Sequence, residues 1–440
     1  MSEWLKNSRA LLKSIAGTIG VKGLSLLISL FTTAAYMHYF SEQEILGVWL
    51  ALVSMLNWIM SFDLGIGNGL RNKLVEALSA GNKKLIKQSI SSAYVLLGVV
   101  SLAILIIGNI ILGYVPWNNL LNISTEVLSA EMLLMVVRIT FTGVILQFFL
   151  RIIISILYAL QKPAIANFVT LISHSLILVF VCLFRADSVE TGMLILAIMQ
   201  AVTVNLPLIV VTIWIFTHEL SEAKPSTKEY IHDLAKKILN LGMQFFWIQL
   251  ALLIINSTND FLIANIYGPG YVVEYQVYDK IFVLLSSGFS LITVPIWSAV
   301  TKALTEKNYV WIKKTYKMLA LTATAISVIA LILPLFYQII VNIWLGSAAI
   351  EVKLSNAYFF AIYNVILIFN YASTSIANGV GQLGIQMKCN TVAAILKIPL
   401  VFLASYVIKD WIGIVFVNII IMLPCAILQP VTILKYLEKR

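Results

Sequence analysis

The chain has little of what a soluble enzyme uses. Only 11% of its 440 residues are charged, and it contains three cysteines and four histidines. Cys182, Cys389 and Cys425 stand alone in apolar stretches, without the spacing of a disulfide framework or a metal site. The sequence also has no glycine-rich phosphate loop and no nucleophile–base pattern. We therefore expect no enzymatic activity, no metal and no cofactor.

Long apolar runs take the place of these features, and 60% of the residues are hydrophobic. A hydrocarbon core about 30 Å thick requires about 20 apolar residues per helix. The runs predict an all-α integral membrane protein with twelve transmembrane helices, at 11–38, 45–65, 89–115, 130–156, 164–184, 192–217, 239–266, 273–299, 317–341, 355–378, 389–408 and 411–434. The loops between them are too short for a soluble catalytic domain.

The positive charge is unevenly placed. Most Lys and Arg lie in the two terminal segments and in every second loop, whereas only Arg185, Lys353 and Lys409 lie in the intervening loops. Because cytoplasmic loops collect Lys and Arg, this pattern predicts a multi-pass protein of the bacterial inner membrane with both termini in the cytoplasm. It explains the net charge of +10 without nucleic acid as a partner. The predicted cytoplasmic loops are 66–88, 218–238, 300–316 and 379–388, and the predicted periplasmic loops are 116–129 and 342–354.

The longest polar stretch divides the chain into two halves. We predict an N-terminal lobe at 1–217, a cytoplasmic linker at 218–238 and a C-terminal lobe at 239–440. Weak repetition supports the division, because five positions coincide at an offset of 226 residues: Ala77/Ala303, Leu78/Leu304, Asn82/Asn308, Ile86/Ile312 and Lys87/Lys313. The pieces 158–163 and 378–383 recur more faintly. Six spans per half predict two parallel six-helix lobes around a central cavity.

Several charged residues lie inside the predicted spans, where an ionisable side chain costs at least ~2.5–3.5 kcal/mol on insertion scales. Arg151 lies near a span end, from which its side chain can reach the headgroups. The basic residues farthest from the span ends are Lys22, Arg138, Lys280 and Lys397, set against the acidic Asp260 and Asp279. This excess of positive charge predicts a cationic cavity, which favours an anionic ligand over a cationic drug.

Three segments carry a resemblance to a known transporter family. Phe62–Ala77 reads FDLGIGNGLRNKLVEA and is similar to the segment that follows the second helix of that family. Val294–Val300, with Trp311–Lys314, is similar to the segment after its eighth helix, and Ala377–Gly381 to the segment after its tenth. The family is that of the Wzx-type flippases for O-antigen and capsular polysaccharide repeat units. Its superfamily also contains the lipid II flippases and the MATE drug exporters.

The resemblance implies a flippase that moves undecaprenyl-diphosphate-linked oligosaccharide repeat units from the cytoplasmic to the periplasmic leaflet by alternating access. Such a protein serves O-antigen and lipopolysaccharide biosynthesis or another polysaccharide pathway. It implies that Lys22 and the adjacent Asp279 and Lys280 bind the diphosphate, and Arg138 joins this set as a further cation within a span. It also implies a monomer, with membrane lipids, the polysaccharide polymerase and the chain-length regulator as partners.

Two further sets of residues allow two interpretations each. Gly17, Gly20 and Gly23 lie in the first predicted span and either form a hinge or serve close packing. The aromatic residues near the predicted cavity either stack on sugar rings or belong to the interfacial belts that membrane proteins have in general, and they are Trp49, Trp58, Trp247, Trp297, Tyr275 and Tyr278.

The resemblance also bears on energy coupling. Asp260 matches an acidic position that looks like a sodium ligand of some lipid II flippases, whereas Lys397 stands where their helix 11 supplies oxygen ligands. We predict that Asp260 and Lys397 pair in at least one state, with coupling to H⁺ or Na⁺. The other interpretation places Asp260 alone in water near a span end. Membrane potential and product consumption remain alternative energy sources.

Three other function classes compete with the flippase. A MATE-type ion-coupled small-molecule exporter shares the fold and is the main alternative. A membrane glycosyltransferase or polymerase would be an enzyme and would normally present a large periplasmic loop or an acidic catalytic cluster, which the sequence lacks. A purely structural scaffold would not need charges within its spans.

Overall fold

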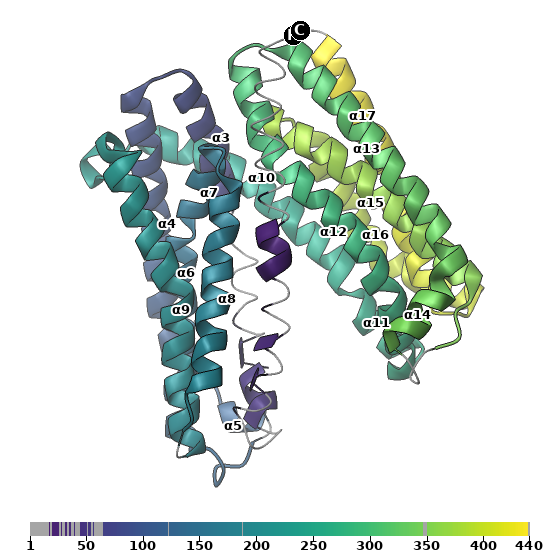
Figure 1. Cartoon of the computed structure of the whole chain (residues 1–440), viewed down its shortest axis with the longest axis horizontal. Coiled ribbons are helices and arrows are strands. Elements are labelled where there is room, and N and C mark those ends of the chain that lie inside the picture. The colour runs from purple at the N-terminus through teal and green to yellow at the C-terminus, as the bar shows by residue number, and fades with distance from the viewer. Residues whose placement is uncertain are drawn as a thin grey trace. The chain divides into compact units, whose positions relative to one another are not determined.

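The computed structural model describes residues 65–121, 123–186, 188–345 and 350–438, together with scattered residues between 17 and 56. Helices make up most of this part of the chain, and none of its residues lies in a strand. Ten helical stretches within it are long and apolar enough to cross a membrane (Figure 1). The prediction of an all-α integral membrane protein is therefore confirmed. The predicted spans 11–38 and 45–65 lie largely outside the described residues.

The described residues divide into two compact units, and the first of them ends at Met243. In this N-terminal unit, α6 packs against α4 and α9, and α8 packs against α9. Its elements are α3 (Ile66–Ser79), α4 (Lys83–Leu112), α5 (Trp117–Leu121), α6 (Ala130–Leu150), α7 (Ile152–Ala159), α8 (Pro163–Leu183), α9 (Val189–His218), η1 (Ser221–Ala223), η2 (Thr227–Glu229) and the first part of α10 (His232–Ser257).

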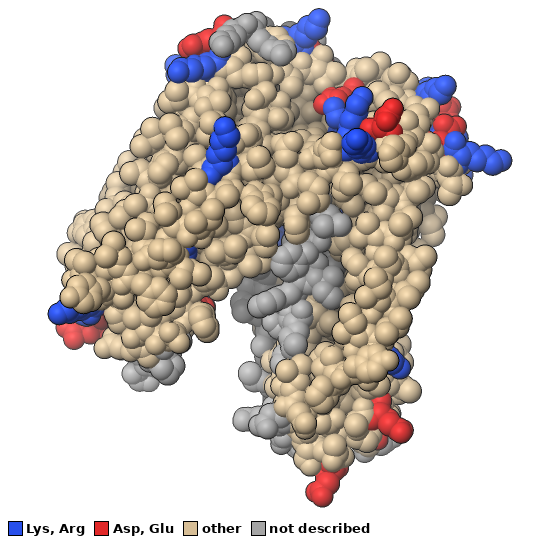
Figure 2. Space-filling view, turned by 180° about the vertical axis from the view of Figure 1, so that it is seen from behind, with Lys and Arg blue, Asp and Glu red and all other residues tan. Residues whose placement is uncertain are grey.

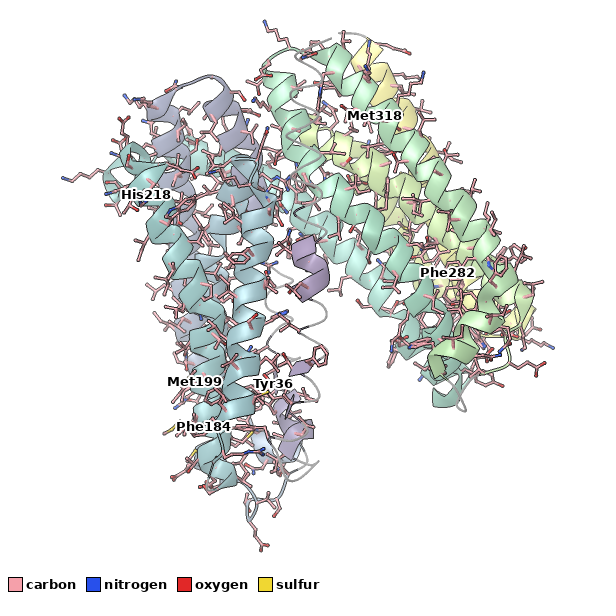
Figure 3. All side chains as sticks on the ribbon, viewed as in Figure 1. Tyr36, Phe184, Met199, His218, Phe282 and Met318 are labelled. Carbon is pink, nitrogen blue, oxygen red and sulfur yellow. The ribbon has the colours of Figure 1, made fainter. Side chains whose placement is uncertain are left out.

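The C-terminal unit begins at Gln244, within α10. Its other elements are α11 (Asn259–Ile266), α12 (Pro269–Thr305), α13 (Tyr309–Ile332), η3 (Leu333–Phe336), α14 (Tyr337–Leu345), α15 (Leu354–Val380), α16 (Gly384–Ile408) and α17 (Ile412–Glu438). Aromatic rings fill much of its core. Phe282, labelled in Figure 3, stacks on Tyr337 with ring centroids 5.4 Å apart, and Tyr278 stacks on Tyr337 at 5.5 Å. Tyr278 is therefore a core residue and does not line an open cavity.

The outer faces of the spans are apolar. Only 11% of the most apolar stretch of α4 is buried within the protein. Ile106, Ile107 and Ile110 are each more than half exposed. Figure 2 shows most charged side chains gathered toward the ends of the helices, with apolar surface between them. A helix that exposes apolar side chains in this way is stable only where lipid replaces water, which agrees with a multi-pass membrane protein.

The repeat in the sequence recurs in the backbone. Asn82 caps α4 by accepting a hydrogen bond from the Leu85 amide at 3.0 Å, and Asn308 caps α13 by accepting one from Trp311 at 3.1 Å. The residue before each cap has a positive φ, 64° at Gly81 and 57° at Lys307. The same pair of positions therefore turns the chain between two helices in each half, as an offset of 226 residues requires.

The fainter recurrence has the same form. The Lys162 amide donates to the Leu157 carbonyl at 2.8 Å, and the Gln382 amide donates to the Ala377 carbonyl at 2.9 Å. The preceding residues have φ values of 60° at Gln161 and 73° at Gly381. All four turns end a helix with one left-handed residue and start the next helix at once.

The predicted linker is a structured strap on the N-terminal unit. Its polar residues are held to α4 and α8 by three ion pairs: Lys83–Glu222 at 2.8 Å, Lys87–Glu229 at 3.9 Å, and Lys162–Glu219. The hydroxyls of Ser91 and Ser92 accept hydrogen bonds from the backbone of the strap, at the Ser226 and Ile231 amides. Lys83 lowers the pKa of the Glu222 carboxyl from its ordinary value through a hydrogen bond and charge attraction.

Close packing explains why two of the segments that resemble Wzx-type proteins contain glycine. An added Cβ at Gly65 would lie 2.0 Å from the Gly242 carbonyl oxygen, and one at Gly69 would lie 2.2 Å from the Ile238 carbonyl oxygen. In the C-terminal unit, Gly379 packs against Val300 and accepts a hydrogen bond from the Thr301 hydroxyl at 2.9 Å. These segments bring α3 against α10 and α12 against α15, so helix packing accounts for their small residues.

Candidate functional site

One span of the C-terminal unit has a local irregularity next to a polar residue, although the backbone of Thr258 stays helical, with φ −88° and ψ −8°. α10 ends at Ser257 and α11 begins at Asn259, with Thr258 between them. Asn259 is only 4% exposed. Polar side chains buried within a span are costly in lipid and commonly mark the site of a substrate or a coupling ion. The surroundings of Asn259 are therefore the first place to look for a site.

The Lys397 ammonium meets Asn259 at this irregularity. Lys397 lies on α16, has no exposed surface, and donates a hydrogen bond to the Asn259 side-chain oxygen at 2.7 Å. It also donates to the side-chain oxygen of Asn418 on α17, which is 1% exposed. The Asn418 amide nitrogen in turn donates to the Asn259 oxygen at 3.3 Å. Side chains from three helices thus converge on one buried charge.

The sequence of α16 places Lys397 inside the unit. Its buried residues recur at helical spacing, at Gln386, Asn390, Ala393, Lys397, Val401 and Ala404, and α16 packs against α17. A lysine on such a face cannot reach water, and an ammonium out of water costs several kcal/mol even after relaxation. Hydrogen bonds to the two amide oxygens offset part of this cost. Within the described chain, no carboxylate forms an ion pair with Lys397.

A chain of hydrogen bonds leads from this centre to α12. The Asn259 amide nitrogen donates to the Tyr275 hydroxyl at 3.0 Å, and that hydroxyl donates to the Asp279 carboxylate at 3.4 Å. Tyr275 is 4% exposed and Asp279 is half-buried. We refer to Asn259, Tyr275, Asp279, Lys397 and Asn418 together as the polar centre. It connects α11, α12, α16 and α17, so a change in its charge would act on all four helices.

The predicted pair of Asp260 and Lys397 is not formed in this structure. The Gln276 side-chain nitrogen donates to the Asp260 carboxylate at 2.7 Å, while Lys397 bonds to the two asparagines. The neighbouring residues Asn259 and Asp260 point in different directions because successive side chains on a helix diverge by about 100°. Pairing of Asp260 with Lys397 in another state stays a prediction.

Asp279 and Lys280 diverge for the same reason. Asp279 faces the polar centre through Tyr275, whereas Lys280 is exposed on α12. Tyr275 is buried as part of this chain and does not offer its ring to an open cavity. A shared role of Asp279 and Lys280 in binding a diphosphate stays a prediction.

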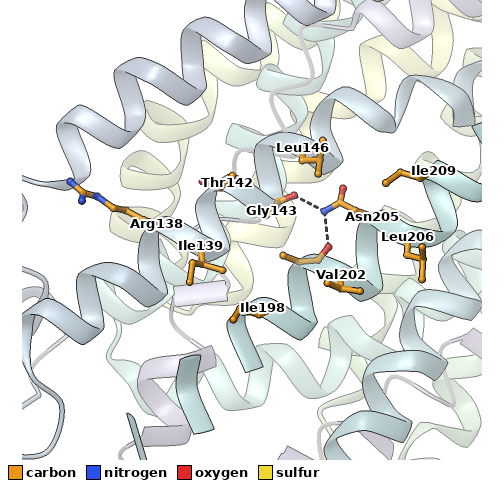
Figure 4. Close-up of a pocket in the computed structure, with 11 residues that line it drawn as sticks. Arg138, Ile139, Thr142, Gly143, Leu146, Ile198, Val202, Asn205, Leu206 and Ile209 are labelled. Carbon is orange, nitrogen blue, oxygen red and sulfur yellow. Dashed lines mark hydrogen bonds between the residues drawn. The ribbon is translucent and has the colours of Figure 1, made fainter. Parts of the chain in front are cut away.

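Arg138 lies at one end of a groove in the N-terminal unit. The groove runs between α6 and α9 and has a volume of about 550 Å³. Figure 4 shows the Arg138 side chain extending away from the apolar residues Ile139 and Ile198. Farther along, the Asn205 side-chain nitrogen donates to the Gly143 carbonyl at 2.9 Å and joins the two helices. Arg138 is thus an exposed cation beside an apolar surface.

The residues predicted on the first span are only partly described. Lys22 is half-buried, and the Ser25 hydroxyl lies 3.2 Å from the His174 ring on α8. An added Cβ at Gly17 would lie 3.3 Å from the Ala164 Cβ, so this glycine packs closely against α8. No described atom lies within 4 Å of an added Cβ at Gly20 or Gly23. No described contact joins Lys22 to Arg138, and their binding role stays a prediction.

Sequence reasoning identified the charges of the polar centre but missed its amides. Asn259 stands out only as one of several polar residues that weaken the seventh span, and Asn418 is a single asparagine in the last span. The signal that could have found them is an unpaired lysine in a span, because a buried ammonium requires acceptors on neighbouring helices.

The chain resembles solved structures of transporters. No family model matches it, and no curated protein sequence matches it. A crystal structure of MATE in the bent conformation aligns with 98% of this chain and 96% of its own, with a TM-score of 0.80 and 15% identity. A mutant of the Vibrio cholerae MATE transporter VcmN aligns with 100% of this chain and 99% of its own, with a TM-score of 0.78 and 12% identity.

A third structure is an outward-facing multidrug resistance MATE family transporter of the MOP superfamily. It aligns with 97% of this chain and 96% of its own, with a TM-score of 0.72 and 14% identity. At these identities the likeness shows the fold, which is that of the MATE transporters. This fold likeness does not by itself assign a substrate.

Proposed function

We propose that the protein is a MATE-type secondary transporter, which exports a solute across the membrane by alternating access and draws its energy from an ion gradient. The observation that carries the proposal is the buried polar centre within the spans of a MATE fold. Burying the Lys397 ammonium costs several kcal/mol. Because this charge links four helices, a change in its contacts would bias the equilibrium between two states of a transporter.

The test is export from intact cells. A strain without its own multidrug exporters would carry the wild-type protein, the Lys397→Met variant or an empty vector, and accumulation of ethidium and of a set of anionic dyes would be followed by fluorescence. We expect lower accumulation of at least one dye with the wild type, and restored accumulation after a protonophore is added. Lys397→Met should accumulate the dye as the vector control does. Equal accumulation of every dye with wild type and vector would argue against small-molecule export.

A second candidate function is the translocation of a lipid-linked oligosaccharide. It is favoured by the exposed cations within the spans, because Arg138 and Lys280 form no ion pair with any described residue. Guanidinium and ammonium groups without an acidic partner suit a diphosphate better than a cationic drug. The three Wzx-like segments support the same substrate, which would be linked to undecaprenyl diphosphate.

One genetic experiment separates the two functions. Deletion of the gene should cause lipid-linked repeat units to accumulate in the cytoplasmic leaflet if the protein is a flippase, and should leave them unchanged if it exports small molecules. Lys22→Ala and Lys280→Ala should then abolish surface polysaccharide while the protein remains abundant in the membrane. Normal polysaccharide in the double variant would exclude these two lysines as diphosphate ligands.

A further inference from the structure

We propose that the Lys397 ammonium permanently occupies a monovalent-cation site formed by Asn259 and Asn418. The C-terminal unit would then carry its own cation on a side chain instead of taking one from solution. The inference deepens the proposed function because it assigns the ion of the polar centre. Its meaning for transport rests on that function.

The geometry is that of a cation bound by neutral oxygens. Two side-chain amide oxygens, from α11 and α17, converge on one nitrogen, and the oxygen of Asn259 lies 2.7 Å from it. All three residues are at least 96% buried. The Asn418 amide nitrogen also donates to the Asn259 oxygen at 3.3 Å, which holds both oxygens in place. The arrangement is a preformed set of acceptors around a single positive charge.

The charges around the site fit an ammonium held in this way. Asp279 is separated from Lys397 by Asn259 and Tyr275, and Asp260 accepts from Gln276. Among the described residues, only neutral amide oxygens therefore accept hydrogen bonds from the Lys397 ammonium. Side-chain amide oxygens also bind hard cations such as Ca²⁺, and transporters hold Na⁺ with carbonyl oxygens of the backbone.

A tethered cation has a functional consequence. A dissolved ion can bind in one state of a transporter and leave in the other, and this difference drives the cycle. The Lys397 ammonium cannot leave. The polar centre should therefore keep its four helices together in the absence of added Na⁺, and any coupling ion must act elsewhere in the protein.

The test replaces the tethered cation with a free one. Lys397→Ala removes the ammonium and most of the side chain, which leaves room for an ion between the two oxygens. Lys397→Met removes the charge but fills the space. Lys388→Ala is the matched control, because Lys388 is an exposed lysine on the same helix. Each purified full-length variant is heated in detergent with sodium, ammonium, methylammonium or choline chloride, at equal ionic strength and fixed pH.

We expect Lys397→Ala in choline to unfold roughly 5–15 °C below the wild type. Sodium, ammonium or methylammonium should raise its midpoint by roughly 2–4 °C, because an ion that binds only the folded state stabilises it. Choline has no N–H group and is too large for the site, so it should have no effect. Lys397→Met and Lys388→Ala should respond to the four ions no more than the wild type does. The double variant Lys397→Ala with Asn418→Leu should lose the response.

Several results would overturn the inference. They are a Lys397→Ala midpoint that no ion raises, a rise that choline produces equally, and a rise with Na⁺ that is no larger in Lys397→Ala than in the wild type. These measurements require no substrate. A protein that fails to transport any tested solute but shows the ion response of Lys397→Ala would contradict the proposed function and leave the cation site intact.

Discussion

Close backbone contact at single residues sets the geometry of the N-terminal unit. Gly65 has a φ of 61° and, with Gly69, faces the backbone of α10 at distances that leave no space for a Cβ. The atoms in the way are carbonyl oxygens, which cannot move without shifting a helix. A side chain at either position would have to separate α3 from α10.

We expect Gly69→Ala to destabilise the protein by roughly 2–4 kcal/mol, within the range of strongly disruptive core substitutions. Gly288→Ala is the matched control, because Gly288 lies within α12 and an added Cβ there would meet no atom within 4 Å. That change should stabilise the helix by roughly 0.5–1 kcal/mol. Thermal unfolding in detergent would measure both effects, and equal midpoints for the two variants would refute the close contact.

Removal of the Tyr275 hydroxyl, again a change at a single residue, tests the chain of hydrogen bonds in the polar centre. The hydroxyl accepts from Asn259 and donates to Asp279, so Tyr275→Phe leaves one buried amide donor without its acceptor. We expect a loss of roughly 1–3 kcal/mol, measured as a lower unfolding midpoint. The effect should nearly vanish when Tyr275→Phe is made on the Asn259→Ala background. Additive losses in the double variant would show that the two residues do not interact.

At the scale of elements, the same turn is built with glycine in one half and with lysine in the other. Gly81 and Lys307 both have left-handed φ values. Glycine adopts such values freely, whereas an L-residue such as lysine does so at a cost of roughly 1–2 kcal/mol. Both precede an asparagine that caps the next helix. The two halves therefore differ in stored strain at equivalent positions.

Exchange of these residues should have opposite effects. Gly81→Lys should destabilise the protein by roughly 1–2 kcal/mol, and Lys307→Gly should stabilise it by roughly 0.5–1 kcal/mol after the greater chain entropy of glycine is subtracted. Midpoints of chemical unfolding would show the two signs. Destabilisation by Lys307→Gly would mean that its side chain, not its backbone, matters at the turn.

The strap formed by the linker at 218–238, which contains η1 and η2, should respond to salt and pH. Its pairs with Lys83, Lys87 and Lys162 are partly or largely exposed, so salt should screen them. The lowered pKa of Glu222 means that its pair adds stability above the ordinary pKa of about 4.3, and that this stability is lost as the pH falls through the lowered value. Protease cleavage within 219–231 should therefore accelerate at high salt and below about pH 4. The triple variant Glu219→Gln, Glu222→Gln and Glu229→Gln should be cleaved at a rate independent of salt.

At the scale of the whole molecule, apolar runs were sufficient to predict the spans. The runs at 164–184 and 355–378 correspond to α8 and α15 within a few residues. Helices that extend beyond the membrane were harder to predict, because α3 and the start of α13 are too polar for a hydropathy criterion. The signal for α13 was its cap Asn308, which the repeat contained but which looks like any other polar loop residue, whereas α3 begins after Gly65 without a side-chain cap.

The polar centre could be predicted only in part for a related reason. A lysine inside a span indicates that acceptors exist, but several oxygens on neighbouring helices could serve, and a carboxylate is the obvious candidate. The choice of Asn259 over the adjacent Asp260 depends on which way each side chain points, and this is set by the packing of α11 against α12. Spacing along one helix does not contain that information.

The topology of the whole chain gives the last prediction. The polar ends of α4 and α13 carry lysines, at Lys83 and Lys313, whereas the region of α5 near Asn119 carries none. The positive-inside rule therefore places Lys83 in the cytoplasm and Asn119 in the periplasm. A version with Cys182, Cys389 and Cys425 replaced by alanine would receive a single cysteine at either position, and intact cells would be treated with an impermeant maleimide.

We expect labelling of Asn119→Cys in intact cells and labelling of Lys83→Cys only after the membrane is opened. Both positions are exposed to solvent, so protection cannot result from burial. The 30 residues of α4 span about 45 Å at 1.5 Å per residue, which exceeds the hydrocarbon core of about 30 Å and puts the two sites on opposite faces. If both cysteines react from the same side, α4 does not cross the membrane. If the two accessibilities are reversed, the span holds but the orientation inferred from the lysines is inverted, and Arg138 then lies in the half of the membrane next to the cytoplasm.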